Sequence, residues 1–325
     1  MKAGWYEKNG EARDVLVVGD METPKPAAGE VLVRLKASGV NPSDVKSRRG
    51  RPLIAPRIIP HSDGAGIVEA VGDGVDAGRI GERVWTWNGQ WKRPFGTAAE
   101  YIALPSAQAV RLPGSIDFDA GACMGIPGLT ALHAVKLHGD VSGKTLLVTG
   151  AAAAVGHYAV QMAKAAGARV IGTASPARRD HALSAGCDAV IDYRSENVAA
   201  RVKELTGGKG ADGIIDMDFS STAALLPGGV LAQHGKFVCY GSNVAGDVSV
   251  AFPALLWGSL SLQFFVVYEL TAQERAARLR ELGEMLEAGI LKHTIGATYG
   301  LDEIVAAHEA VEAGKVTGNV VLRTG

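Results

Sequence analysis

The residues that most clearly suggest chemistry are small ones, in a turn between an apolar strand and a helix. Residues 146–156 read LLVTGAAAAVG, and a helical pattern follows over residues 158–164. Such a unit presents the first backbone N–H groups of the helix, and the positive end of its dipole, to a nucleotide pyrophosphate. Gly150 and Gly156 hold the outer positions of a G-x-x-G-x-x-G pattern, and Ala153 holds the middle one. The turn predicts a dinucleotide site with a methyl group where the backbone approaches the pyrophosphate.

The end of the next predicted strand, residues 169–173, indicates which cofactor is bound. A site for NAD places Asp or Glu there to hold the ribose 2′-hydroxyl, whereas a site for NADP lacks the acid and supplies cations. Residues 174–179 read ASPARR, with no acid. The hydroxyl of Ser175 and the guanidinium of Arg178 or Arg179 suit a 2′-phosphate. The alternative is that the arginines belong to a solvated helix face. The sequence favours NADPH.

Alternating strands and helices position this turn. Strands are predicted at residues 145–149, 169–173, 189–192, 213–217, 236–240 and 262–267. Helices are predicted between them at residues 154–166, 177–185 and 196–205, and near 221–226. This order predicts an α/β fold with a parallel, doubly wound sheet.

The flanking parts of the chain have a different pattern. Short strands with Gly and Pro turns are predicted before the alternation, at residues 31–35, 65–71, 83–87 and 99–103. Two helices and a strand are predicted after it, at residues 272–287, 301–312 and 319–322.

Composition narrows the class of protein. The chain has 325 residues, 47% of them apolar, and a formal net charge of −1. This balance and the lack of a basic stripe argue against nucleic-acid or membrane partners. The most apolar late stretch, residues 252–268, is interrupted by Pro and Gly and is too short to span a bilayer. The three separated cysteines, Cys123, Cys187 and Cys239, fit reduced thiols in a cytoplasmic protein.

Several longer motifs, in one order, indicate a family. They read GVNPSD at residues 39–44, PHSDGAG at 60–66, GERV at 81–84 and GIPGLTA at 125–131, before the glycine turn. With them, the chain resembles the zinc-independent quinone oxidoreductases of the medium-chain dehydrogenase/reductase superfamily, which include zeta-crystallin. The resemblance runs from end to end.

This resemblance implies an architecture and an activity. It implies a mostly-β, GroES-like catalytic domain over residues 1–122, a Rossmann NADP-binding domain over 123–267 and a return to the catalytic domain over 268–325. It also implies NADPH in an interdomain cleft, hydride transfer to a small-molecule quinone, and a homodimer.

The resemblance also suggests which residues form the site. Asn41 and Thr130 are expected near the nicotinamide. The remaining expected cofactor contacts are Ala152, Ala153, Ala154 and Val155 at the pyrophosphate, Ser175, Arg179 and Tyr193 at the adenosine phosphate, Gly241, Ser242, Phe265, Val266 and Val267 along the nicotinamide half, and Asn319 at its far side.

One position departs from the family pattern. Lys46 stands where many relatives have a tyrosine, and it is a candidate to polarise a carbonyl oxygen or donate a proton. Alternatively, it points to solvent or holds a cofactor phosphate. Asp44 is expected to be a turn or helix-capping residue rather than an acid catalyst. His157 is expected on the helix surface, without a role.

The same motifs argue against zinc. Catalytic zinc needs three Cys, His or carboxylate ligands. Asn41 stands where zinc-dependent relatives have Cys, and His61-Ser62-Asp63 replaces a Gly-His-Glu run. His61 is therefore expected to be structural, and no metal site is predicted. Without a Lewis acid, quinones and activated alkenes are better acceptors than the carbonyl partners of simple alcohols, because the hydroquinone anion is stabilised by its ring.

Two other functions remain open. The first is an NADPH-dependent enone (alkene) reductase on the same scaffold. The second is an NADPH-binding protein with little catalysis, in a structural or RNA-binding role. Four aromatic residues in the segment that replaces a zinc lobe are either a wall for a flat substrate or core packing: Trp85, Trp87, Trp91 and Phe95.

Overall fold

The computed structural model describes residues 1–325 and divides into two compact units. The first comprises residues 1–127, 279–289 and 293–325, and the second comprises residues 128–278 and 290–292. Residues 123–127 belong to the first unit, where the backbone N–H of Ile126 donates to Asp63 Oδ2 at 3.1 Å. Residues 268–278 belong to the second, where Arg275 Nη2 donates to the carbonyl of Val267 at 2.5 Å.

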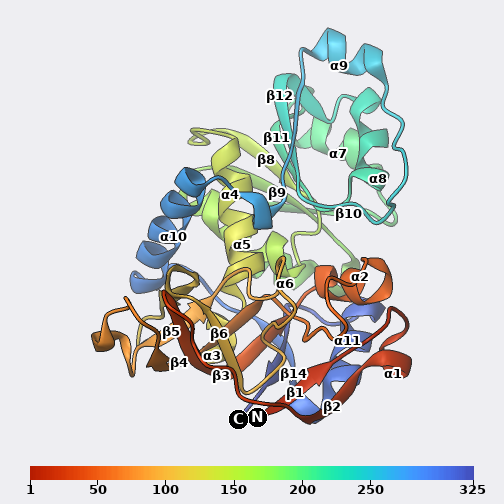
Figure 1. The fold of residues 1–325 in the computed structure, drawn as a ribbon. Helices are drawn as coiled ribbons and strands as arrows, with labels where there is room; N and C mark the ends of the chain where they lie inside the picture. The colour runs from red at the N-terminus through yellow and green to blue at the C-terminus, as the bar shows by residue number, and fades with distance from the viewer. The chain divides into compact units, whose positions relative to one another are not determined.

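The second unit is built on a sheet of six parallel strands (Figure 1). Its strands are β8 (Thr145–Val148), β9 (Arg169–Ala174), β10 (Ala189–Asp192), β11 (Ala211–Asp216), β12 (Leu231–Cys239) and β13 (Ser261–Phe264). Their order, β10-β9-β8-β11-β12-β13, reverses direction beside β8, as a dinucleotide-binding sheet does. The predicted doubly wound sheet is confirmed.

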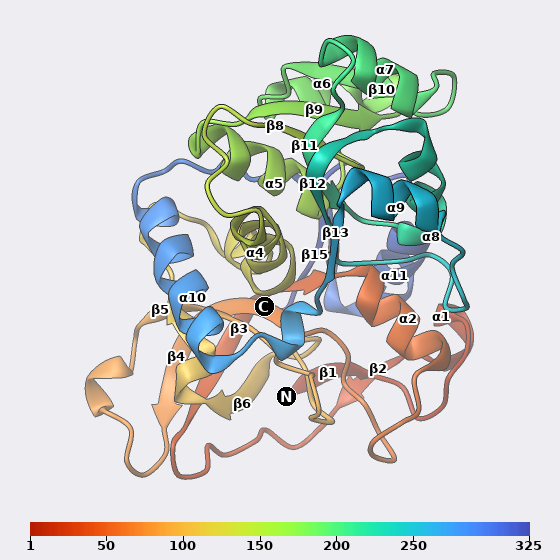
Figure 2. The same ribbon diagram turned by 90° about the horizontal axis from the view of Figure 1, so that it is seen from above.

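Helices cover both faces of this sheet. They are α4 (Leu129–Leu137), α5 (Ala154–Ala165), α6 (Arg179–Ser184), α7 (Val198–Leu205), α8 (Phe219–Thr222) and α9 (Phe252–Gly258). In Figures 1 and 2, α4 and α5 lie on one side of the strands, and α7 and α8 lie on the other. Strand residues such as Leu147, Ile171 and Ile214 are completely buried in one core cluster, as expected for a parallel sheet covered on both faces.

Two predicted elements of this unit end differently. The helix predicted at 177–185 is a 3₁₀ turn, Pro176–Arg178, followed by α6. The last strand, predicted at 262–267, stops at Phe264. Its neighbour β12 ends at Cys239, which pairs with Phe264 and accepts the N–H of Phe265 at 3.2 Å, so Val266 and Val267 have no strand to bond.

The first unit contains a seven-stranded, largely antiparallel sheet and a two-stranded one. Its strands are β1 (Lys2–Trp5), β2 (Val17–Asp20), β3 (Glu30–Val40), β4 (Asp63–Val71), β5 (Arg83–Thr86), β6 (Tyr101–Pro105), β7 (Ala109–Arg111), β14 (Ile295–Gly300) and β15 (Asn319–Arg323). Its helices are α1 (Ala12–Val15), α2 (Pro42–Gly50), α3 (Phe118–Gly121) and α11 (Ile304–Ala313). A further helix, α10 (Ala272–Glu287), continues from the second unit into the first.

No helix of the structure combines the length and the apolar character needed to cross a bilayer. The apolar stretch at residues 252–268 forms α9 and β13.

Helix α2 follows directly from the central strand β3. Asn41 is its N-cap residue and Pro42 its first residue, where the missing N–H of proline costs no hydrogen bond. The carboxylate of Asp44, three residues on, accepts the backbone N–H of Asn41 at 2.8 Å. The expectation that Asp44 caps a helix is confirmed. The cap fixes where Asn41 lies at the end of β3.

A chain of buried polar groups connects α2 to α11 and to the sheet. Its members are Arg48, His308, His61, Ser38, Thr97 and the carbonyl of Asp63. The closest pair of imidazole atoms, His61 Nε2 and His308 Nε2, are 2.9 Å apart, and the two rings are stacked. His61 has a positive φ of 75°, which few residues other than glycine adopt. The Arg48 guanidinium, which is completely buried, also forms an ion pair with Glu312 of α11.

The donors of this chain can be assigned from both of its ends. The Thr97 hydroxyl must donate to the carbonyl of Asp63, so it accepts from Ser38, which in turn accepts from His61 Nδ1. At the other end, Arg48 can only donate to His308 Nδ1, so the proton of His308 lies on Nε2. His308 Nε2 therefore donates to His61 Nε2, and both rings are neutral.

Both imidazoles resist protonation in the folded chain. Burial lowers the pKa of His61 to about 3. Burial, then electrostatic coupling to His61 and to Arg48, hold the pKa of His308 well below its usual range. An extra proton on His61 Nε2 would place two donors against each other. The unfolded chain, with ordinary histidines, therefore binds protons near pH 6.5 that the folded chain does not.

The pair should thus make the folded state sensitive to acid. Stability is full above about pH 6.5 and is lost as pH falls below it, by about 1.4 kcal/mol per histidine at pH 5.5. Between pH 7.5 and pH 5.5, the free energy of unfolding of the parent chain should fall. In the double variant His61→Gly/His308→Leu this fall should be smaller by about 2–3 kcal/mol. Urea denaturation at the two pH values measures this difference. An equal loss in both proteins would contradict it.

Candidate active site

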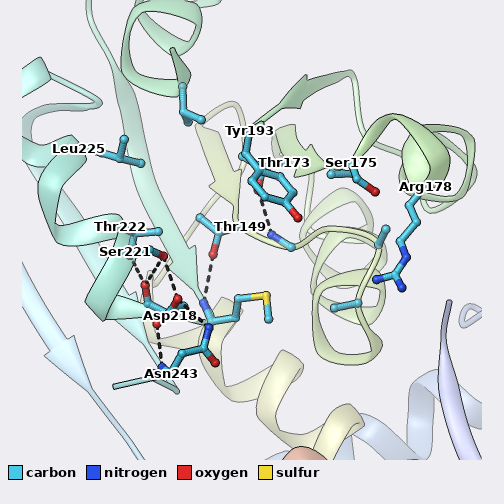
Figure 3. Close-up of a pocket in the computed structure, with 16 residues that line it drawn as sticks. Thr149, Thr173, Ser175, Arg178, Tyr193, Asp218, Ser221, Thr222, Leu225 and Asn243 are labelled. Carbon is cyan, nitrogen blue, oxygen red and sulfur yellow. Dashed lines mark hydrogen bonds between the residues drawn. The ribbon is translucent and has the colours of Figure 1, made fainter. Parts of the chain in front are cut away.

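A cavity of about 360 Å³ opens in the second unit at the carboxyl ends of its central strands (Figure 3). Its lining comes from the ends of five strands, β8 to β12, and the segments that follow them: Thr149, Gly150, Ala152, Ala153, Thr173, Ala174, Ser175, Arg178, Tyr193, Val198, Met217, Asp218, Ser221, Thr222, Leu225 and Asn243. Ligands bind at this edge of open α/β sheets, where the strand order reverses.

The glycine turn lies in the wall of this cavity. Gly150 has a φ of +64°, and a Cβ on Gly156 would stand 2.1 Å from the carbonyl oxygen of Gly150. Ala153 is the N-cap residue of α5 in an ordinary extended conformation, so its methyl group causes no backbone strain. Ala154 and Val155 are the first residues of α5. The turn therefore presents the start of the helix to the cavity, as predicted from the sequence.

One end of the cavity is cationic and free of acids. Figure 3 shows Ser175 and Arg178 together at this end, with Tyr193 beside them. Arg179 is not part of the lining, and its Nη1 donates instead to the carbonyl of Val190 at 2.7 Å. At the tip of β9, Thr173 Oγ1 accepts the backbone N–H of Gly150 at 3.0 Å, which holds the turn against the strand. Of the two arginines, Arg178 is the one placed to meet a 2′-phosphate.

The opposite end contains residues that the sequence reasoning missed. Asp218 accepts hydrogen bonds from the backbone and the amide of Asn243, both at 2.8 Å, and from Ser221 at 2.9 Å (Figure 3). These bonds fasten the loop after β12 to the start of α8. The rule that ligands bind beyond the carboxyl ends of parallel strands was the signal that could have found them, since Asp218 lies two residues after the end of β11.

A buried carboxylate keeps these strand ends together. Asp216 Oδ1 accepts the hydroxyl of Thr149 at 2.7 Å, and that hydroxyl accepts the backbone N–H of Met217 at 3.1 Å. Burial raises the pKa of Asp216, and the hydrogen bonds from Thr149 and its neighbours oppose the rise. The bonds join β8 to β11, which bear the two sides of the cavity.

The residues expected along the nicotinamide half lie in or beside the same unit's sheet. Thr130 of α4 is buried, and its hydroxyl has no hydrogen-bond partner. One helical turn later, His133 packs edge-on against Phe265, with ring centroids 4.7 Å apart. Val266 is exposed and Val267 is buried. An unpaired buried hydroxyl is costly, and a ligand amide could pair with it.

Two further residues expected there shape the loop after β12. A Cβ on Gly241 would stand 2.6 Å from the carbonyl oxygen of Met217, so only glycine allows this approach. Ser242 Oγ donates to the carbonyl of Val244 at 2.8 Å.

Three expected site residues lie in the first unit. Asn41 Nδ2 donates to Asp63 Oδ2 at 2.9 Å, so its amide is held in one orientation. Lys46 is exposed on α2. Asn319 opens β15, and its Nδ2 donates to the carbonyl of Thr294 at 3.1 Å.

Asn41 lies between two buried carboxyl groups. Burial raises the pKa of Asp44 to about 7, against the hydrogen bonds it accepts from Asn41. Burial, then the nearby Asp44, hold the pKa of Asp63 well above its usual range. Burial therefore disfavours the charged form of both carboxyl groups beside Asn41.

The residues present do not fit a zinc ion. No three His, Cys, Asp or Glu side chains are grouped so that they could hold a metal. Both ring nitrogens of His61 are already bonded, to Ser38 and to His308, and His61 is structural as expected.

The aromatic residues and His157 have mixed positions. Trp85 is fully buried in the first unit, so it is core packing, whereas Trp91 lines a small cavity and Phe95 is exposed.

The expectation that His157 lies on the helix surface is wrong. It is buried and stacked on His181 at 4.2 Å, because the following helix α6 covers it.

Comparisons with known proteins agree with this geometry. Residues 27–114 match the alcohol dehydrogenase GroES-like domain, and residues 185–322 match a zinc-binding dehydrogenase model. A Pseudomonas aeruginosa quinone oxidoreductase is 34% identical, with 95% of each chain covered. A 2-haloacrylate reductase from a Burkholderia species is 30% identical, over 99% of this chain and 98% of its own. A mycobacterial protein solved in complex with NADPH has a TM-score of 0.86 at 29% identity, covering 99% of this chain and 100% of that one.

The fold and the cofactor-type cavity define a medium-chain dehydrogenase/reductase with a GroES-like domain and a Rossmann domain. Within that superfamily, the chain belongs to the quinone oxidoreductase family. The fold class and the family inferred from the sequence are both confirmed.

The cationic end of the cavity gives a direct test of the cofactor. We expect the parent protein to bind NADPH at least about tenfold more tightly than NADH, because Arg178 supplies a charge-assisted bond to the 2′-phosphate. Arg178→Gln should remove most of this preference, and Arg179→Gln should keep it, since Arg179 is bonded to Val190. Titration of both cofactors by calorimetry measures the ratio. Loss of the preference only in Arg179→Gln would reverse the assignment.

Proposed function

We propose that this protein is an NADPH-dependent quinone oxidoreductase that works without zinc. The observation that carries the proposal is the cavity at the glycine turn, with an acid-free β9 tip and Arg178 beside it. Membership of the quinone oxidoreductase family supports the choice of acceptor. NADPH, when bound, supplies the hydride. The quinone gains that hydride and a proton and leaves as the hydroquinone.

The protein's own residues then bind and orient. The first N–H groups of α5, at Ala154 and Val155, hold the pyrophosphate, and Ala152 and Ala153 allow its approach. Ser175 and Arg178 hold the 2′-phosphate, and Tyr193 flanks the adenosine. Such a site lowers the activation barrier of hydride transfer because its donors and its aromatic wall are already in place and need no rearrangement during the reaction.

Asn41 and Thr130 are proposed to contact the nicotinamide. Asn41 is presented in one orientation by Asp63, and Thr130 has an unpaired hydroxyl in a buried position. Lys46, exposed on α2, remains a candidate to polarise the acceptor carbonyl. Phe265, Val266, Gly241, Ser242 and Asn319 complete the proposed cofactor contacts.

A second candidate, reduction of an activated alkene, is favoured by one comparison. The Burkholderia relative is named a 2-haloacrylate reductase, and it matches nearly the whole chain. Hydride addition to an alkene conjugated with a carbonyl needs the same cofactor geometry as hydride addition to a quinone. A third candidate, NADPH binding without turnover in an RNA-binding role, is disfavoured by the net charge of −1.

A panel of acceptors separates these candidates. We expect NADPH oxidation, followed by absorbance, to be fastest with 1,4-benzoquinone, slower with an α,β-unsaturated ketone and absent with a simple aldehyde, because only the first two stabilise the added charge without a metal. Dialysis against a chelator should leave the quinone rate unchanged. Turnover of the aldehyde, or zinc in a 1:1 ratio by metal analysis, would contradict the metal-free chemistry.

We also propose that the protein is a cytoplasmic homodimer that joins through the β13 edge of its sheet. β13 has β12 on one side only, so its other edge offers unpaired N–H and C=O groups. Large exposed side chains lie on β13 and on α9, the helix just before it: Phe252, Leu256, Trp257 and Phe264. Trp257 is 80% exposed, which favours burial against a second copy. The three cysteines are free and buried, which suits a reducing compartment.

Removing this apolar edge should separate the copies. We expect the parent protein to have twice the mass of one chain by light scattering, and Trp257→Ser/Phe264→Ser to raise the dimer Kd at least about tenfold, roughly 1.4 kcal/mol. The control is Val17→Ser/Ile80→Ser, which removes two other exposed apolar side chains, in the first unit. A parent protein that is monomeric at micromolar concentration would overturn the proposed dimer.

A further inference from the structure

A second cavity, in the first unit beside α2, has a composition suited to a charged acceptor. Its volume is about 140 Å³. Its wall combines aliphatic, aromatic, hydroxyl and cationic side chains, among them Leu53, Ile54, Trp91, Tyr6, Arg51 and Lys92. No Asp or Glu lines it.

Two cations gather around one indole in this cavity. The guanidinium carbon of Arg51 lies 4.9 Å from the ring centroid of Trp91, and Lys92 Nζ lies 5.8 Å from it. Arg51 is exposed, and no carboxylate forms an ion pair with it. The ring attracts each cation, but the two cations repel each other. An anion bound between them would relieve that repulsion.

Tyr6 adds a hydroxyl group to this wall. The residue is only 4% exposed, and it lines the cavity. Burial, and then the charge of Asp44, raise its pKa to about 12, so the hydroxyl keeps its proton at neutral pH. A protonated hydroxyl in this wall can donate a hydrogen bond to an anion in the cavity.

The cavity lies along α2, the helix that Asn41 caps. Asp44, whose carboxylate holds the backbone N–H of Asn41, also acts electrostatically on Tyr6 and is itself influenced by Arg51. Ser47, one helical turn after Ser43 on α2, also lines the cavity. The helix α2 thus relates Asn41, at its start, to the wall of this cavity, at Ser47 and Arg51.

We propose that this cavity binds an anionic group of the acceptor, so that the preferred substrates are quinones or activated alkenes that carry a carboxylate or sulfonate. Trp91 and the aliphatic wall take the flat apolar body, and Arg51, Lys92 and the Tyr6 hydroxyl take the anion. This inference rests on the proposed hydride transfer for the identity of the reacting group, but its anion site can be tested without turnover.

The kinetic test compares two acceptors that differ in one charge, 1,2-naphthoquinone-4-sulfonate and 1,2-naphthoquinone. In the parent protein the sulfonate should have the lower KM, and added salt should raise that KM. Arg51→Gln should raise the KM of the sulfonate relative to that of the neutral quinone about tenfold. The matched control is Arg57→Gln, because Arg57 lies over Trp5 at 4.8 Å in the same kind of contact but outside the cavity. It should leave the ratio unchanged.

The binding test uses naphthalene-2-sulfonate, which cannot accept a hydride. Calorimetry should show binding to the parent protein that Arg51→Gln weakens about tenfold and that Lys92→Gln, at an exposed position, weakens in the same direction. If this binding is present but no quinone is reduced, the proposed function fails and the anion site stands. If quinones are reduced with equal KM for both acceptors, in the parent and in Arg51→Gln, the anion site is overturned and the proposed function stands.

Discussion

The close contact between the start of α5 and the end of β8 is the constraint on which the site depends. A side chain on Gly156 would collide with the carbonyl oxygen of Gly150, and Gly150 itself has a φ of +64°, so both positions favour glycine. This contact aims the helix N-terminus at the carboxyl edge of the sheet. Thr173 and Asp216 then hold the neighbouring strand ends in register with it. The backbone at Ala153 is extended, so its methyl group is accommodated without strain.

In the first unit, hydrogen bonds between buried polar groups hold Asn41 and α2 in place. Asn41 is held by Asp44 and Asp63, and α2 is fastened to α11 through Arg48 and His308. Each buried group has to find a partner, so one arrangement of α2 is strongly preferred over others. The neutral imidazoles of His61 and His308 join the segment before β4 to α11 through a hydrogen bond. The cost of this arrangement is sensitivity to acid.

Much of the fold followed from patterns within short segments. The alternation of strand and helix patterns after residue 144 predicted the parallel sheet. Strand β10 and helix α10 begin and end where expected. The misses have physical causes. The signals for α2, an asparagine cap, a proline and a capping carboxylate, were present at residues 41–44 but lie in a helix of low amphipathicity. β13 is shorter than its apolar run because its partner strand ends first.

The sequence by itself determined the glycine turn, the absence of an acid after β9, and the family, because each is carried by residue types at fixed spacing. Only the tertiary structure separated Arg178 from Arg179, since their roles depend on which way each side chain leaves the turn before α6. It also revealed Asp218, the histidine pair and the cations around Trp91. These groups come from segments far apart in the chain, and spacing along a sequence carries no information about which distant side chains meet.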